Sequence, residues 1–182
     1  DTIKKSPKFG KAYNEYGAAL VMKGENESAK RQFLKAAELG DKTTPLFNLG
    51  YLAMRNNDFE LAEKYFTEGV KIIPDAAVYR KLGSVYLEMN GRYRDKDYLS
   101  KAIEYLEKAY RMDGGDEILA LKLAGLYCRV NRYEDAKAIL QNAINGKPGS
   151  YIEKPARKIL DKINELEAKG GIKESVAQMA GQ

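Results

Sequence analysis

The chain has 182 residues, of which 44% are hydrophobic and 31% charged, and its 31 basic and 26 acidic residues leave a net charge of +5. This composition is typical of a folded, water-soluble chain, and the length suffices for one domain of about 150 residues plus extensions. One cysteine and no histidine exclude an internal disulfide, a zinc site of Cys and His ligands, and a histidine base. We therefore expect neither a cofactor nor a metal.

Small residues recur along the chain at a nearly constant spacing. Gly17, Gly50 and Gly83 lie 33 residues apart, and Ala124 follows 41 residues after Gly83. Three large or apolar residues flank each of them and are themselves spaced by three and four positions, which is the spacing of one helix face. The flanking residues are Tyr13, Tyr16 and Leu20; Leu46, Leu49 and Ala53; Tyr79, Leu82 and Tyr86; and Ala120, Leu123 and Tyr127. The pattern predicts an amphipathic helix around each small residue.

A second helix is predicted after each of these, from a small–large–small pattern spaced by four and three residues. Its members are Ala29, Phe33 and Ala36; Ala62, Phe66 and Gly69; Ala102, Leu106 and Ala109; and Ala136, Leu140 and Ala143. A small residue at the crossing lets two helices approach to about 8–10 Å. The large residues are predicted to fill the space toward the neighbouring pair, so the pairs must stack to bury their apolar faces.

Turn residues separate the predicted helices at 23–26, 55–58, 89–92 and 130–132, and Pro74 and Pro148 close the second and fourth pairs. This set of small, large and proline positions resembles the tetratricopeptide repeat family, whose helix-turn-helix units have about 34 residues. Four units align at 10–42, 43–75, 76–116 and 117–150, after a leading segment at 1–9. The resemblance implies an all-α fold, a right-handed solenoid of antiparallel helix pairs whose first helices line a concave groove.

A capping helix is predicted over 151–168, where apolar residues from Ile152 to Leu166 recur at helical spacing and cover the last unit. Ser150 and Glu153 have the spacing of a capping box, and Pro155 fits only in the first turn. Residues 169–182 are a tail or a short helix, because 172–180 is weakly amphipathic. Docking and disorder of this tail both stay open.

The third unit is longer than the others, and its extra residues are placed near 91–98, between its two helices. Closing a slightly longer loop costs well under about 1 kcal/mol. This segment is either a contact element that carries Tyr93 and Tyr98, or a tolerated surface insertion or an extra half-turn of helix. Cys128, on a first helix, is expected to be a small packing residue rather than a reactive thiol.

The resemblance implies that exposed positions of the first helices bind a partner. At these positions six side chains are basic and two, Glu15 and Glu88, are acidic. The candidate groove residues are Asn14, Phe47, Asn48, Tyr51, Met54, Arg55, Arg80, Lys81, Lys122 and Arg129. A basic groove with apolar residues suggests an acidic peptide or helix with an apolar anchor. The alternative is that Phe47 and Tyr51 only cover the adjacent unit.

The predicted function is a non-catalytic scaffold that binds a partner protein's peptide or helix and helps to assemble a complex. The alternative is self-assembly, in which a leading or trailing segment of one chain occupies the groove of another. Single-stranded RNA binding needs a larger basic excess, and we expect no nucleic-acid partner. No run approaches the roughly 20 apolar residues of a membrane helix, so we expect no membrane span. The cytoplasm is favoured over a processed envelope or periplasmic location.

Overall fold

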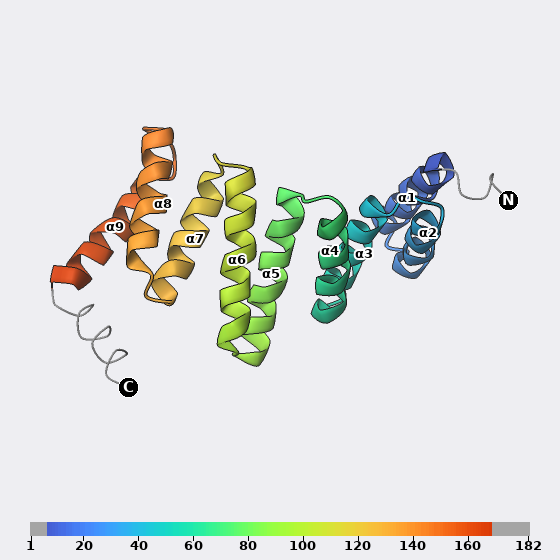
Figure 1. The fold of residues 1–182 in the computed structure, drawn as a ribbon, viewed down its shortest axis with the longest axis horizontal. Coiled ribbons are helices and arrows are strands. Elements are labelled where there is room, and N and C mark those ends of the chain that lie inside the picture. The colour runs from blue at the N-terminus through green and yellow to red at the C-terminus, as the bar shows by residue number, and fades with distance from the viewer. Residues whose placement is uncertain (1–6, 169–182) are drawn as a thin grey trace. The chain divides into compact units, whose positions relative to one another are not determined.

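The computed structural model describes residues 7–168, which form nine α-helices and no strand (Figure 1). The helices are α1 (Pro7–Met22), α2 (Asn26–Glu38), α3 (Thr43–Arg55), α4 (Phe59–Ile72), α5 (Ala76–Tyr93), α6 (Lys96–Met112), α7 (Glu117–Arg129), α8 (Tyr133–Gly146) and α9 (Glu153–Ala168). The predicted all-α helical repeat fold is confirmed over this range. None of these helices is long and apolar enough to cross a membrane.

Two predicted segments fall partly or wholly outside the described residues. Of the leading segment 1–9, residues 7–9 belong to α1 and residues 1–6 are not described. The predicted tail at 169–182 is not described either.

The chain divides into two compact units, Asp1–Met112 and Asp113–Gln182, and each is described by itself. In the first unit α1 packs on α2, α3 on α4 and α5 on α6, while α2 also packs on α3 and α4 on α5. In the second unit α7 packs on α8, and α9 packs mainly on α8 and to a lesser extent on α7. Within each unit, consecutive helices thus pack on one another.

Glycines allow the two helices of each pair in the first unit to approach closely. A Cβ placed on Gly50 of α3 would lie 2.7 Å from the ring of Phe66 on α4, and one on Gly83 of α5 would lie 2.5 Å from Leu106 on α6. The same arrangement recurs at Gly17. The large residues that were expected to face the neighbouring pair therefore also fill the space above the glycine of their own pair.

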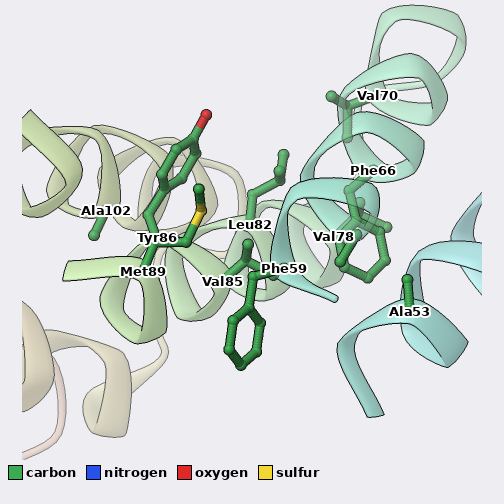
Figure 2. Packing of buried hydrophobic residues seen from close by; sticks show 11 residues of the cluster. Ala53, Phe59, Phe66, Val70, Val78, Leu82, Val85, Tyr86, Met89 and Ala102 are labelled. Carbon is green, nitrogen blue, oxygen red and sulfur yellow. The ribbon is translucent and has the colours of Figure 1, made fainter. Parts of the chain in front are cut away.

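The hydrophobic core of the first unit continues from one pair to the next. One buried cluster joins α3, α4, α5 and α6, as Figure 2 shows. It consists of Ala53, Phe59, Ala62, Phe66, Val70, Val78, Leu82, Val85, Tyr86, Met89 and Ala102. Each large apolar side chain buried in this way stabilises the fold by about 1.5–3 kcal/mol, and side chains from both pairs must be present to exclude water.

The turn predicted at 89–92 is wrong, because α5 continues through it to Tyr93. Met89 is only 3% exposed, and the Tyr93 hydroxyl donates a 2.6 Å hydrogen bond to the Glu60 carboxylate on α4. These contacts keep the extra turn helical. The chain reverses at Arg94, whose φ is +53°, so most of residues 91–98 lengthen α5 and α6 instead of forming a loop.

The last described helix, α9, covers apolar surface of the second unit. Ala156 and Ile163 on this helix are buried, as is Ile152 just before it. Pro155 lies in the first turn of α9, as predicted, where a missing N–H leaves no helical hydrogen bond unmade.

The capping box predicted from Ser150 and Glu153 does not form. The Glu153 carboxylate instead accepts a 2.7 Å hydrogen bond from the N–H of Gly149 and contacts Arg157 within its own helix. Gly149 has φ +78°, a backbone conformation that a residue with a side chain rarely adopts. The start of α9 is therefore held by a glycine turn one residue earlier than the sequence pattern suggested.

Candidate functional site

The first helices of the pairs in the first unit, α1, α3 and α5, present neighbouring side chains. The Asn48 amide of α3 donates a 2.8 Å hydrogen bond to the side-chain oxygen of Asn14 on α1. Asn14 is buried and Asn48 half-buried, so this bond satisfies polar groups that burial would otherwise leave without a partner. We call the surface that carries Asn14, Asn48, Tyr51, Arg55 and Lys81 the first-helix face.

An aromatic ring and a cation meet on this face between α3 and α5. The Lys81 Nζ lies 5.4 Å from the centre of the Tyr51 ring. Tyr51 is 43% exposed and Lys81 is exposed, so both remain accessible to a ligand. Such a pair contributes about 0.5–1 kcal/mol at an exposed site, and it holds a positive charge directly beside an apolar surface.

Two predicted site residues pack inward. Phe47 and Met54 are half-buried and lie against the core cluster of α3–α6. A Cβ on Gly69 of α4 would lie only 2.2 Å from the Phe47 ring, so this ring occupies the space that the glycine leaves. The structure therefore places Phe47 and Met54 at the edge of the core, and Tyr51 is the exposed aromatic residue of α3.

The remaining predicted residues differ in exposure and in the unit to which they belong. Arg55 is exposed at the end of α3, whereas Arg80 on α5 is half-buried. Lys122 and Arg129 are both exposed on α7, in the second unit. Eight of the ten predicted residues thus lie on α1, α3 and α5, and the other two share one helix of the other unit.

Sequence reasoning missed a cavity of about 700 Å³ in the second unit. Its lining residues come from α7, α8 and α9: Gly125, Cys128, Tyr133, Lys158, Ile159, Asp161, Lys162, Ile163, Glu165 and Leu166. The helical spacing of Ile159, Ile163 and Leu166 was the available signal. It was interpreted as one face covering the last unit, but of these three only Ile163 is fully buried.

The cysteine in this cavity is not an activated nucleophile. Cys128 is half-buried, and this burial raises the pKa of its thiol above the usual value. The thiolate is the reactive form, so a raised pKa leaves the thiol protonated at neutral pH. Within residues 7–168 no group of three or more Cys, Asp or Glu side chains is placed to hold a metal ion.

Comparison with known proteins identifies the class to which this fold and site belong. Models of the tetratricopeptide repeat family match residues 44–75 and residues 97–153. With the repeated helix pairs, these matches show that the chain contains tetratricopeptide repeats. Proteins built from these repeats are generally non-catalytic scaffolds for protein–protein interactions.

Individual relatives share parts of the sequence or the fold. The anaphase-promoting complex subunit CDC16 of Saccharomyces cerevisiae is 29% identical over 133 residues, which span 71% of this chain but only 16% of that protein. A tetratricopeptide repeat protein from Parabacteroides merdae superposes with a TM-score of 0.72 at 15% identity, over 96% of this chain and 68% of its own. YrrB, described as a TPR protein with an unusual peptide-binding site, superposes with a TM-score of 0.63 at 16% identity, over 91% of this chain and 90% of its own. At these identities the two solved structures show a common fold.

Proposed function

We propose that the first-helix face binds an acidic peptide or helix of a partner protein and thereby helps to assemble a complex. The observation that carries this proposal is the exposed pair of Tyr51 and Lys81, 5.4 Å apart on α3 and α5. A carboxylate of the ligand would pair with the Lys81 ammonium while a neighbouring apolar side chain covers the Tyr51 ring. Tyrosine is among the residue types that most often carry the binding energy of protein interfaces.

Further charge on the same helices supports an acidic ligand. Arg55 lies one helical turn after Tyr51 and is exposed, so a second carboxylate has a partner on α3. Lys122 and Arg129 on α7 are further candidate contacts of the second unit. Positive charge of this kind accelerates the encounter with an acidic partner and selects against basic ones.

The known relatives agree with a role in binding and assembly. YrrB is described as having a peptide-binding site, and CDC16 is a subunit of the anaphase-promoting complex. For this chain, binding and complex assembly through the first-helix face are our proposal. Self-assembly remains the second candidate, and in that case the ligand is a segment of another copy.

The test compares the proteins retained from a lysate of the source organism by the wild-type chain and by Lys81→Glu. Lys81 is the better position than Arg80, because it is exposed and its substitution should leave helicity and melting unchanged. We expect the bound partner to lose affinity by about tenfold or more, since a glutamate would repel an acidic ligand. Lys64→Glu, at an exposed position of α4, is the matched control and should retain the partner.

Retention of the same proteins by Lys81→Glu and wild type would overturn the assignment of the site. A molar mass that rises with the concentration of the purified chain, and falls back for Lys81→Glu, would instead establish another copy as the ligand. Light scattering measures that mass directly.

A further inference from the structure

The cavity of the second unit has apolar walls from two helices, and the proposed partner-binding face does not include it. α7 contributes Gly125 and Cys128, and α9 contributes Ile159, Ile163 and Leu166. A Cβ placed on Gly125 would meet no atom within 4 Å, so the cavity is open above this glycine. The volume of about 700 Å³ is sufficient for several apolar side chains.

α9 has one apolar face, and one edge of this face is incompletely covered. Ala156 and Ile163 are fully buried, whereas Ile159 is half-buried and Leu166 is 37% exposed. Positions 159, 163 and 166 follow the i, i+4, i+7 spacing and therefore form a single stripe along the helix. This stripe borders the cavity and is covered at Ile163 only.

The sequence that follows α9 carries a stripe of the same spacing. Ile172, Val176 and Met179 are again related by i, i+4, i+7, in a segment outside the described residues. Residues 169–171 separate them from α9, and antiparallel helices are commonly joined by 2–8 residues. In an antiparallel arrangement the two stripes coincide to within one residue: Leu166 with Ile172, Ile163 with Val176, and Ile159 with Met179.

We propose that Ile172, Val176 and Met179 occupy the cavity between α7 and α9 of their own chain. These side chains would then cover the part of the α9 stripe that the described residues leave exposed. The short connection keeps the segment at a high effective concentration near the cavity, which favours the same chain over a second copy. This binding site is independent of the first-helix face.

Cys128 makes the proposal measurable. It lies in the wall of the cavity and is the only cysteine of the chain. Occupation of the cavity would cover its thiol, so a thiol reagent could react only when the segment detaches. The rate of thiol modification therefore reports on this cavity alone.

The experiment measures the reaction of the full chain with dithionitrobenzoate at constant pH. The double variant Ile172→Asp/Val176→Asp removes the apolar stripe, and we expect Cys128 to react roughly fivefold faster or more. Ala177→Asp/Gln178→Asp places the same two acids off the stripe in the same segment and should react like the wild type. Should the first variant lose helicity by circular dichroism, Met179→Asp alone replaces it.

Equal rates for the stripe variant and the wild type would overturn the proposal, as would equal acceleration by the off-stripe control. Wild-type protection that grows with protein concentration would also overturn it, because the occupant would then be the segment of another copy. None of these measurements involves Lys81, so failure of this proposal is distinguishable from failure of the proposed partner-binding function.

Discussion

Single glycines decide how closely the helices of a pair approach. At Gly50 the absent side chain leaves room for the ring of Phe66, which is 2% exposed and enclosed by the core. Gly91, near the end of α5, is exposed, and a Cβ there would meet nothing within 4 Å. Glycine is therefore required for the packing at position 50, whereas at position 91 the packing would accept a larger residue.

We predict that Gly50→Leu lowers the free energy of unfolding by about 1–3 kcal/mol or more, because a buried ring must move to admit the new side chain. Gly91→Leu should raise it by up to about 1 kcal/mol, because leucine is a better helix former than glycine. Urea denaturation followed by circular dichroism measures both. Unchanged stability of Gly50→Leu would contradict the packing described at the crossing.

Aspartates start several of the helices. Asp58, Asp75 and Asp116 each accept a hydrogen bond from the backbone N–H three residues later. Such caps satisfy a donor that the helix leaves unpaired and stabilise it by about 1 kcal/mol each. They define where α4, α5 and α7 begin.

At the level of elements, the extended α5 is held to its neighbours by aromatic side chains. Tyr93 bonds to Glu60 on α4, and its ring lies 5.9 Å from that of Tyr98 on α6. The Tyr93 hydroxyl is the main reason that the pKa of Glu60 lies below its ordinary value. The hydrogen bond stabilises the charged carboxylate, so it contributes to stability only where Glu60 is ionised.

We predict that Tyr93→Phe raises the pKa of Glu60 toward its ordinary value, which NMR titration of the carboxyl carbon measures. Because the folded-state pKa of Glu60 is lowered, the variant should lose the whole contribution of this hydrogen bond to stability above about pH 5. The difference in stability between variant and wild type should disappear as the pH falls through the folded-state pKa. The loss should stay below about 1 kcal/mol, since Glu60 is exposed. Tyr98→Phe is the control and should leave the pKa of Glu60 unchanged.

At the level of the whole molecule, the helices pack into two compact units. In repeat proteins stability is approximately a sum of terms from each repeat and its nearest neighbours. A substitution in the core of one unit should therefore loosen that unit first. Ile163, 1% exposed on α9, is a suitable position in the second unit.

We predict that Ile163→Ala destabilises the second unit by about 2–5 kcal/mol, because it deletes a buried side chain and leaves a cavity. Hydrogen exchange read by mass spectrometry should show faster exchange in α7–α9 and unchanged exchange in α1–α4. Lys162→Ala, one residue away and largely exposed, should leave both regions unchanged. An equal increase in the exchange rate throughout the chain would mean that the two units unfold as one.

The candidate site was only partly predictable. Asn14, Asn48, Tyr51 and Lys81 were all selected from the sequence, but their pairing across α1, α3 and α5 appears only in the structure. Phe47 was assigned to the same surface, yet its ring packs on Gly69. The spacing along α3 places a residue on a face, but it cannot show whether a neighbouring helix covers that face.

The sequence by itself determined the all-α fold, the repeated helix pairs, the small residues at their crossings and most of the turns, because each of these depends on spacings of a few residues within one helix or turn. The tertiary structure decided the length of α5, the partner of Glu153 and the accessible part of the first-helix face. It also decided that Ile159 and Leu166 border a cavity. These features depend on contacts between residues far apart in the chain, whose energies exceed the local preferences that the sequence pattern records.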